Sequence, residues 1–255
     1  MRQAPIDAAW LPPPEAPQLG PDEVHVWLAR LDVAPNALCE LLDRTERERA
    51  ERFHCAEDRR RFMVSHARLR GILGRYLRLT PSHIRFEAGA WGKPALAREC
   101  AATDIRFNMS HSGELALYAV AAGREVGIDL EAMRSPFRWE DLAKRFFTPG
   151  EVAQLHALPD SDRSVAFFDL WTCKEAYTKA TGQGLSLPLN RFEVSLSTRQ
   201  VRSLSDDRPS NASPVRWTLR TLCPGAGYAA AVVFEGPDMK LNLWRWPTDG
   251  VARRA

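Results

Sequence analysis

Two acidic residues, two positions apart, are the first feature of this sequence that could do chemistry. Asp129 and Glu131 lie in Glu125–Glu131, where apolar and polar residues alternate with the period of a strand. Side chains two apart on a strand share a face, so the two Cα atoms lie about 6–7 Å apart and both carboxylates can reach one hard cation. Mg²⁺ suits this pattern, because a few carboxylates bind it while water and substrate phosphate complete its octahedron. The alternative is an edge strand that shows two acids to solvent.

A helix predicted around Trp171 supplies a third carboxylate and two ammonium groups. On a 3.6-residue period its core-facing arc consists of Ala166, Leu170, Cys173, Tyr177 and Ala180. The opposite arc consists of Trp171, Lys174, Glu175, Thr178 and Lys179. We therefore expect an exposed surface that holds an anionic, partly flat ligand, with Glu175 as a further oxygen donor to the cation. The alternative is a solvated face on which Glu175 and Lys179 form an i,i+4 pair.

A third segment, Ser110-His-Ser-Gly113, combines hydroxyl, imidazole and glycine groups. We expect it to form a tight turn whose donors and close backbone approach suit phosphate oxygens. A histidine in such a place can also be an ordinary turn residue. Gly92–Leu96 reads as a loop with one positive charge, at Lys93. The sequence contains no Gly-x-Ser-x-Gly motif, which argues against acyl-serine chemistry.

Positive charge is concentrated in one part of the chain. Between Arg44 and Arg85 there are twelve arginines and five acidic residues, a local excess of seven on a chain of net charge +3. Within a helix predicted from about Asp58 to Leu79, the buried stripe consists of Phe62, His66, Leu69, Leu73 and Tyr76. A second stripe consists of Arg61, Arg68 and Arg75. Such a stripe is usually solvated; a nucleic acid, a phosphate-rich small molecule or an acidic protein could also bind it.

Five motifs occur in a fixed order: Gly92-Lys-Pro94, Asn108-x-Ser110-His-Ser-Gly113, Val126-Gly-Ile-Asp-x-Glu131, Phe146-Phe-Thr-Pro-Gly-Glu151 and Trp171-x-x-Lys-Glu-Ala-x-x-Lys179. Together they resemble the 4'-phosphopantetheinyl transferase superfamily, in particular its Sfp (surfactin-synthetase-activating) type in the variant with Trp and Lys-Glu-Ala. The resemblance covers most of the chain, from about Arg44 to Phe234.

The resemblance implies that the protein transfers the 4'-phosphopantetheine arm of coenzyme A to a serine hydroxyl of an apo acyl, aryl or peptidyl carrier protein and releases 3',5'-ADP. It implies Mg²⁺, with Mn²⁺ as a possible substitute, held by Asp129, Glu131 and Glu175. The implied catalytic residues are Glu175, a base for the serine acting directly or through water, and Lys179. The implied coenzyme A contacts are Arg49, Arg61, Lys93, Pro94, Ser110, His111, Lys174 and Lys179. One departure is Glu46, which stands where the family often has a basic residue for the 3'-phosphate.

The predicted fold class is α+β. An Arg-Phe-Glu triplet follows each long helix, at Arg85 and at Arg191, which indicates a duplicated unit. The resemblance likewise implies two similar halves related by pseudo-twofold symmetry, with the active site in the cleft between them. The expected divisions are an extended lead-in (1–20), a first half with the nucleotide contacts (21–124), a second half with the metal and catalytic residues (125–246) and a tail (247–255).

Composition excludes several classes of protein. No apolar run approaches the roughly 20 residues of a membrane helix, and the N-terminus lacks the layout of a signal peptide. Five cysteines without Cys-x-x-Cys argue against a disulfide framework and a zinc site. We expect a cytoplasmic monomer whose partners are coenzyme A and carrier proteins, without nucleic acid or membrane. The alternatives are a Mg²⁺-dependent phosphohydrolase of a nucleotide-like substrate and a non-catalytic basic binding module.

Overall fold

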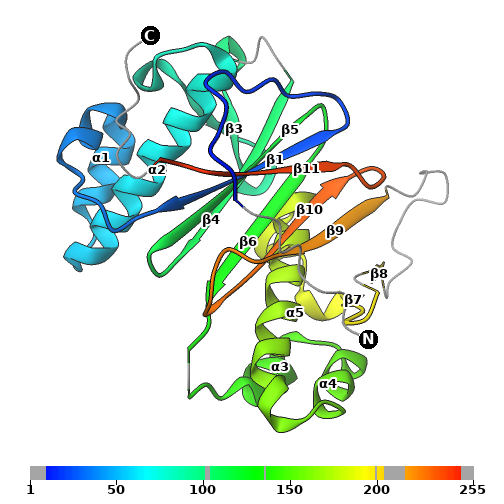
Figure 1. Ribbon diagram of the computed structural model, residues 1–255. Coiled ribbons are helices and arrows are strands. Elements are labelled where there is room, and N and C mark those ends of the chain that lie inside the picture. The colour runs from blue at the N-terminus through cyan, green and yellow to red at the C-terminus, as the bar shows by residue number, and fades with distance from the viewer. Residues whose placement is uncertain (1–9, 101–103, 135, 199, 204–215, 248–255) are drawn as a thin grey trace. The chain divides into compact units, whose positions relative to one another are not determined.

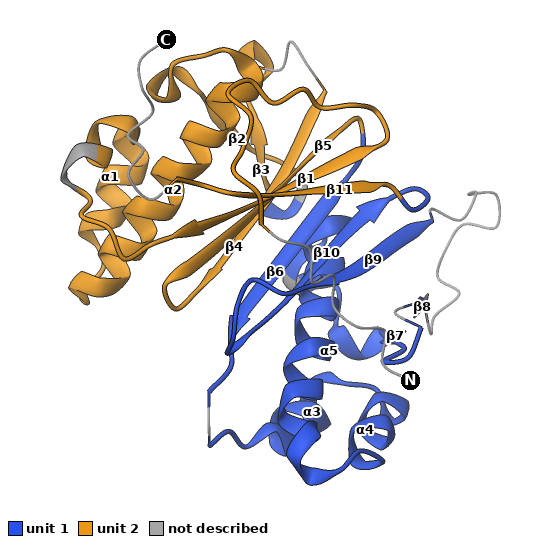
Figure 2. Ribbon diagram, in the orientation of Figure 1, with its two compact units in different colours: residues 1–8, 90–93, 124–238 blue, residues 9–89, 94–123, 239–255 orange. Residues whose placement is uncertain are grey.

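The computed structural model describes residues 10–100, 104–134, 136–198, 200–203 and 216–247 (Figure 1). The chain divides into two compact units (Figure 2). We call residues 1–8, 90–93 and 124–238 the carboxylate unit, because it carries the three acids of the predicted metal site. We call residues 9–89, 94–123 and 239–255 the arginine unit. The predicted α+β class is confirmed, since each unit combines helices with a largely antiparallel sheet.

The arginine unit is built on a four-stranded sheet in the order β11-β1-β5-β4. Its strands are β1 (Glu23–Arg30), β4 (Ile105–Ser112), β5 (Leu115–Ala122) and β11 (Lys240–Arg245). β1 runs parallel to β11 and antiparallel to β5, and β4 and β5 form a hairpin. The other elements are α1 (Arg44–Glu51), α2 (Ala56–Leu77), the strand pair β2 (Phe86–Ala88) and β3 (Pro94–Leu96), and 3-10 helices at Asn36–Leu41, Pro81–His83 and Arg98–Cys100.

Helix α2 covers one face of this sheet and forms the core of the unit with it. The predicted stripe is confirmed at Phe62, Leu69 and Leu73, which are buried against residues of β1, β4 and β5 such as Trp27 and Phe107. The acidic residues of its first turn favour the helix start, because they face the positive end of the helix dipole. Helix α1 begins with a capping box, in which the Asp43 side chain and the Glu46 side chain each accept the other's backbone N–H.

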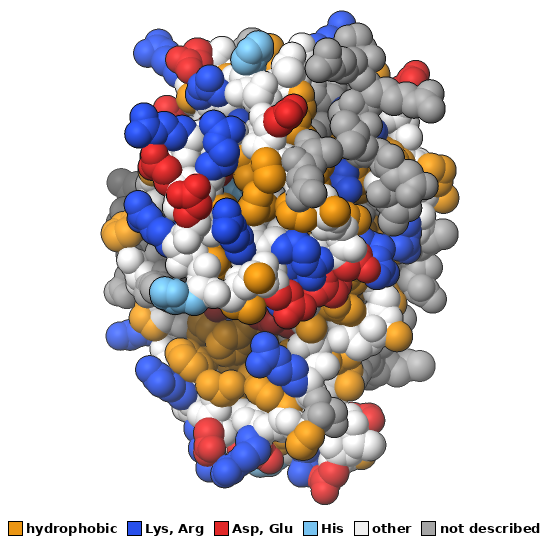
Figure 3. Space-filling view, turned by 90° about the vertical axis from the view of Figure 1, so that its left-hand side faces the viewer, with side chains coloured by type: hydrophobic (Ala, Val, Ile, Leu, Met, Phe, Trp, Pro, Cys, Tyr) orange, Lys and Arg blue, Asp and Glu red, His pale blue; other side chains and the backbone are white. Residues whose placement is uncertain are grey.

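The expected basic face on α2 is wrong. Arg68 is only 5% exposed, and its guanidinium lies 5.5 Å from the ring centroid of Trp246. The guanidinium of Arg75 lies 4.5 Å from the same ring. On the surface shown in Figure 3, lysine and arginine side chains are interspersed with acidic ones. Two of the three arginines of the seven-residue repeat therefore pack on an aromatic side chain from the C-terminal end of the chain, and the third, Arg61, pairs with Glu57 and Glu114. The basic binding module thus loses its main support.

The carboxylate unit contains the antiparallel sheet β6-β10-β9 and three helices. Its strands are β6 (Val126–Ala132), β9 (Trp217–Leu222) and β10 (Tyr228–Glu235), with the small pair β7 (Phe192–Val194) and β8 (Val201–Ser203). The helices are α3 (Trp139–Phe146), α4 (Pro149–His156) and α5 (Asp160–Thr181), with 3-10 turns at Ala90–Gly92, Gly184–Ser186 and Leu189–Arg191. As expected of two similar halves, α5 and α2 each have 22 residues and each pack on a sheet.

The expected division between residues 124 and 125 nearly coincides with the observed one between 123 and 124. Two details need correction. Residues 239–246 belong to the arginine unit, because β11 pairs in parallel with β1, and residues 90–93 belong to the carboxylate unit. Of the predicted lead-in, only residues 10–20 are described, and Leu11 bridges to Trp244. The predicted tail lies outside the described residues except for Pro247.

Helix α5 approaches β6 unusually closely, at Gly127. A Cβ atom at Gly127 would lie 2.2 Å from the carbonyl oxygen of Ala176 and 2.3 Å from the backbone nitrogen of Ala180. Both neighbours are backbone atoms, which no rotamer change can move away. Glycine is therefore required at position 127, because any side chain would push the helix off the strand.

We predict that Gly127→Ala destabilises the protein by about 3 kcal/mol or more, because the helix must move away from the sheet and leave packing gaps. Chemical denaturation followed by circular dichroism would measure the loss. Gly20→Ala is the control, since its nearest atom would be the flexible Glu23 carboxylate at 3.3 Å. We expect the control to change stability by less than about 1 kcal/mol. Equal stabilities of the two variants would contradict the backbone contact.

Candidate active site

The face of β6 that meets α5 carries the first two predicted metal ligands. Side chains alternate along a strand, so Gly127, Asp129 and Glu131 share one face, and Gly127 meets the helix there. On α5, Glu175 and Lys179 each come directly before one of the two alanines that contact Gly127. The close contact therefore brings the acids of the strand and the charged residues of the helix together, as the sequence predicts.

Charge interactions link these side chains. Lys179 Nζ donates a hydrogen bond of 2.6 Å to Asp129 Oδ1, and Asp129 is only 3% exposed. Burial raises the pKa of Glu175 above its usual range, the Asp129 carboxylate raises it further, and Lys179 opposes both; Glu131 adds a smaller upward effect. A carboxyl group in these surroundings resists ionisation until another positive charge arrives. The cluster is thus short of positive charge.

Carboxylate oxygens are the donors that Mg²⁺ prefers, so this set of side chains fits the ion chemically. Within the described part of the chain, however, no three His, Cys, Asp or Glu side chains lie close enough together to form a ready-made metal centre. The ammonium group of Lys179 lies against Asp129, where a metal ion would also have to bind. A cation at this site would therefore compete with Lys179 for Asp129.

Lys174, predicted to be an exposed coenzyme A contact, is fully buried, and that prediction is wrong. Its ammonium group donates to both carboxylate oxygens of Glu151, at 2.6 and 2.8 Å, and to the carbonyl oxygen of Phe192 at 2.7 Å. These three bonds use all three hydrogens of the ammonium group. Glu151 also caps α4 by accepting the backbone N–H of Thr148, and it accepts that of Val194. The pair joins α4, α5 and β7 and is structural.

Trp171 also differs from expectation, since its ring packs on Phe146, Phe147 and Phe167 and does not form an exposed flat surface. Lys93 lies at the C-terminal end of α5. Its ammonium group donates to Glu125 at 2.7 Å, to the carbonyl oxygen of Val126 at 3.0 Å and to that of Ala180 at 3.3 Å. A lysine there stabilises the negative end of the helix dipole. A nucleotide contact by Lys93 would have to replace one of these bonds.

In the arginine unit, Ser110 and His111 lie on strand β4 and not in the tight turn expected from the sequence. Neighbouring residues of a strand point to opposite faces, so the two side chains cannot act side by side. His111 shares the face of Phe107 and Met109, which pack in the core under α2, while buried Ser110 lies on the other face. Of the two, His111 is exposed and remains the better candidate for a phosphate contact.

The structure groups His111 with Arg49, a second predicted phosphate contact. The Arg49 guanidinium lies 5.2 Å from the ring centroid of Phe62, and this ring packs on His66 at 4.0 Å. Burial lowers the pKa of His66 to about 4, and electrostatic interactions with Arg49 and His111 add to the lowering. His66 is therefore neutral at physiological pH. No local pattern in the sequence indicates this grouping, because its members come from α1, α2 and β4.

The departure at Glu46 has a structural reason. Besides capping α1, Glu46 accepts a hydrogen bond of 2.7 Å from Nε of Arg70, whose side chain is fully buried. Arg70 Nη2 also pairs with Asp43 at 2.6 Å. A basic residue at position 46 would leave Arg70 without this partner, and it would place two cations together in a buried site. Position 46 is therefore not a phosphate contact in this protein.

We predict that Lys174→Met destabilises the protein by about 3–5 kcal/mol, because it leaves the Glu151 carboxylate buried without its counter-ion. Adding Glu151→Gln should recover part of the loss, since the amide carries no charge. Urea denaturation would give the three free energies of unfolding. Lys144→Met, at an exposed lysine of α3, is the control and should cost less than about 1 kcal/mol. A mild Lys174→Met variant would rule out the structural role.

Comparison with known proteins places this geometry in a family. The model described as "4'-phosphopantetheinyl transferase superfamily" matches residues 125–233, and the model "4'-phosphopantetheinyl transferase, N-terminal" matches residues 33–124. The chain is 40% identical over 244 residues to 4'-phosphopantetheinyl transferase HetI of Nostoc sp., across 94% of this chain and 100% of that protein. It is 35% identical over 198 residues to 4'-phosphopantetheinyl transferase Sfp of Bacillus subtilis, across 78% and 84%. The chain therefore belongs to the 4'-phosphopantetheinyl transferase superfamily, as its motifs indicated.

Proposed function

We propose that the protein transfers the 4'-phosphopantetheine arm of coenzyme A to a serine of a carrier protein in a Mg²⁺-dependent reaction that uses the Asp129 cluster. The serine oxygen forms a bond to the phosphorus that carries pantetheine, the bond from that phosphorus to the bridging oxygen breaks, and 3',5'-ADP leaves. The observation that supports this proposal most strongly is the position of Asp129, Glu175 and Lys179 where β6 and α5 meet. It provides carboxylates and an ammonium group for a reaction that depends mainly on charge and alignment.

Asp129, Glu131 and Glu175 would hold the Mg²⁺, and Mn²⁺ could take its place. The ion would supply positive charge to the diphosphate of coenzyme A. The upward shift in the pKa of Glu175 supports this assignment, because burial and its acidic neighbours leave the cluster in need of a cation. The family resemblance assigns Glu175 as the base for the serine proton as well, directly or through water, although a bound cation would lower the proton affinity of its carboxylate.

Lys179 is the ammonium group that we assign to the diphosphate. Its side chain is 29% exposed, whereas that of Lys174 is 0% exposed. A cation bound at Asp129 would compete with the Lys179 ammonium and release it toward an anionic substrate. Charge-assisted hydrogen bonds from Lys179 would then favour the developing charge on the leaving diphosphate oxygen.

For the nucleotide part of coenzyme A we propose Arg49 and His111 as the main contacts. Arg49 is exposed and forms no ion pair among the described residues, and both Arg49 and His111 interact electrostatically with His66. Ser110 and Pro94 stay proposals from the family motif, and Lys93 would contribute only after giving up one of its hydrogen bonds. The choice among acyl, aryl and peptidyl carriers stays open.

Location and assembly stay predictions from the sequence, namely a cytoplasmic monomer that binds neither nucleic acid nor membrane. Among the described residues, no helix combines the length and the apolar character that crossing a bilayer would need.

We predict that the purified chain, incubated with coenzyme A, Mg²⁺ and an apo carrier protein, increases the carrier's mass by one phosphopantetheine group. Mass spectrometry would measure the gain, and chromatography would show 3',5'-ADP. Asp129→Asn should lower the rate at least about 100-fold with the fold intact. Loss of coenzyme A without a mass gain would indicate hydrolysis instead. If neither changes across acyl, aryl and peptidyl carriers, the proposed function is wrong.

The metal assignment predicts opposite effects of two substitutions on one helix. Glu175→Gln should weaken Mn²⁺ binding, because it removes a negative ligand, and should lower transfer by about 10²–10⁴-fold. Lys179→Met should strengthen Mn²⁺ binding in the absence of coenzyme A, because Asp129 loses the ammonium that competes with the ion, and yet should lower transfer. Electron paramagnetic resonance would measure bound Mn²⁺. Unchanged Mn²⁺ affinity in both variants would remove the cluster as the metal site.

A further inference from the structure

The turn between β4 and β5 carries a carboxylate that none of the motifs includes. Gly113 and Glu114 form a two-residue turn between the paired residues Ser112 and Leu115. Gly113 has a φ of 56°, which suits the first position of a type II' hairpin turn and favours glycine there. Glu114 follows at the tip, two residues after Ser112 and three after the candidate phosphate contact His111.

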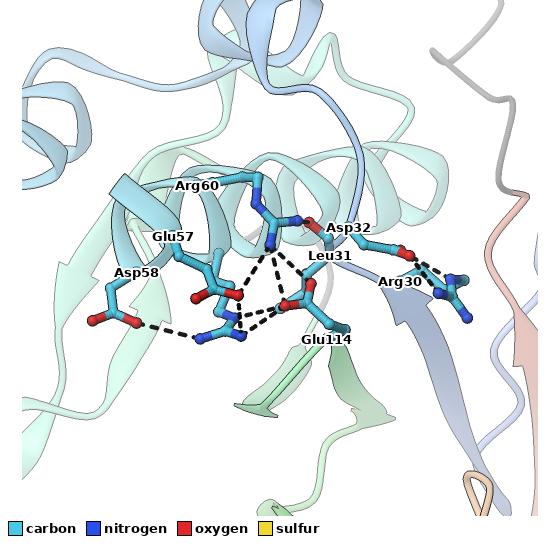
Figure 4. A network of polar contacts seen from close by, with 8 residues as sticks. Arg30, Leu31, Asp32, Glu57, Asp58, Arg60 and Glu114 are labelled. Carbon is cyan, nitrogen blue, oxygen red and sulfur yellow. Dashed lines mark hydrogen bonds and ion pairs between the residues drawn. The ribbon is translucent and has the colours of Figure 1, made fainter. Parts of the chain in front are cut away.

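Glu114 holds this tip against the N-terminal turns of α2 (Figure 4). Its carboxylate accepts from Arg60 Nη2 at 3.1 and 3.0 Å, and its Oε1 accepts from Arg61 Nε at 3.1 Å and Nη2 at 2.7 Å. Arg60 also donates to the carbonyl oxygen of Leu31 at 2.6 Å, while the Leu31 N–H donates to that of Glu114 at 2.9 Å. The end of β1, the start of α2 and the hairpin tip are thus joined at one point.

The charges agree with a tight contact. Burial alone would raise the pKa of Glu114, but its hydrogen bonds with Arg61 and Arg60 outweigh burial, and the pKa is lowered. The side chains of Arg60, Arg61 and Glu114 are 25%, 23% and 31% exposed. A partly buried network with two arginines on one carboxylate is more strongly held than an isolated surface pair.

Arg61 is poorly placed to bind a phosphate directly. Besides Glu114, its guanidinium donates to Glu57 at 2.7 Å and to Asp58 at 3.4 Å. Three carboxylates around one guanidinium repel a phosphate dianion and occupy the donors that would bind it. The family resemblance implies that Arg61 acts at the nucleotide end, and its ion pairs favour an indirect role there over direct contact with a phosphate.

The contacts of Glu114 with Arg60 and Arg61, which we call the joint, link the elements that carry the two candidate phosphate contacts. Arg49 lies over Phe62, the residue that directly follows Arg61 on α2. His111 lies on β4, one strand position before the residue that pairs across the turn. Because Glu114 ties the β4–β5 tip to Arg60 and Arg61, it restrains the strand that carries His111 relative to the helix on which Arg49 packs.

We infer that Glu114 is a positioning residue for coenzyme A, which acts through Arg60 and Arg61 to align His111 with Arg49. This inference rests on the proposed function, and it assigns Arg61 to the same alignment in place of a phosphate contact. The guanidinium groups of Arg60 and Arg61 offset the negative charge of Glu114, which would otherwise repel a phosphate nearby.

The sign of one substitution separates the two roles of Arg61. Glu114→Gln removes a negative charge beside the nucleotide end. If Arg61 binds phosphate, this change frees the guanidinium and tightens the binding of coenzyme A. If Glu114 positions His111, the change loosens binding by about 5- to 20-fold. Isothermal titration of the full-length protein with coenzyme A measures the dissociation constant without a carrier protein.

We expect KM for coenzyme A to rise in parallel in Glu114→Gln while kcat changes less than about twofold, since chemistry takes place at the Asp129 cluster. Arg61→Gln should have a similar effect, and the double variant should be no weaker than the weaker single variant, because both break one joint. Glu114→Asp keeps the charge with a shorter reach and should fall between wild type and Glu114→Gln. Additive losses would show that Arg61 has its own contact and would overturn the inference.

Asp32→Asn is the matched control. Asp32 pairs with Arg30 at the end of β1, beside the joint but outside it (Figure 4). Its coenzyme A affinity should stay within twofold of wild type, and thermal melts would check the fold of every variant. If the wild-type protein binds coenzyme A and the Glu114→Gln variant binds it equally well or more tightly, the positioning role is wrong and the proposed function stands. A wild-type protein that binds no coenzyme A would overturn the proposed function and this inference with it.

Discussion

The contact between α5 and Gly127 determines whether the candidate active site exists at all. Side chains normally fill the space between a helix and a sheet, but here backbone meets backbone, and a Cβ at position 127 would lie 2.2 Å from a carbonyl oxygen. The neighbouring strand also leaves room for this close approach, since β10 has alanines opposite Asp129 and Glu131. Short reach matters for the chemistry: carboxylates of a strand and of a helix share one cation only when the two backbones are close.

Two lysines on α5, five residues apart, show how burial separates structural from chemical roles. All three hydrogens of the Lys174 ammonium group are donated inside the carboxylate unit. Moving this group toward a substrate would break the buried ion pair and leave the Glu151 carboxylate without a counter-ion. Lys179 is partly exposed and lies on an acid that a cation would also seek. An ammonium group that can be exchanged for a metal ion suits a site that must hold its charges in balance before and after substrate binds. The residue type alone, lysine in both cases, does not distinguish the structural role of Lys174 from the chemical role of Lys179.

Local patterns in the sequence predicted the two long helices, the strand that carries Asp129 and Glu131, and the carboxylates that lie near one another, because periodicity and spacing report on short-range geometry. Contacts between residues far apart in the sequence could not be predicted from these patterns. The 3.6-residue period placed Lys174 on the polar arc, and nothing near it indicated that Glu151, 23 residues earlier, would be buried with it. The repeat of Arg68 and Arg75 looked solvated because Trp246, which covers both, lies at the other end of the chain. Ser110 and His111 were expected to lie together in a turn, but β4 continues through both of them to Ser112. The sequence does not mark the end of this strand to within a few residues.

The excess of arginines in the arginine unit has a largely internal explanation. Arg70 is buried with Glu46 and Asp43, and Arg60 and Arg61 share Glu114. Each of these guanidinium groups joins elements distant in sequence, a task that its planar set of donors performs better than a lysine could. Local net charge therefore overstates the charge available to a ligand. Arg49 differs, since it is exposed and rests on an aromatic ring that leaves its donors accessible. The unit thus contains arginines that hold its own elements together, with Glu46 as one of their partners, and an exposed arginine, Arg49, whose charge is not used in this way.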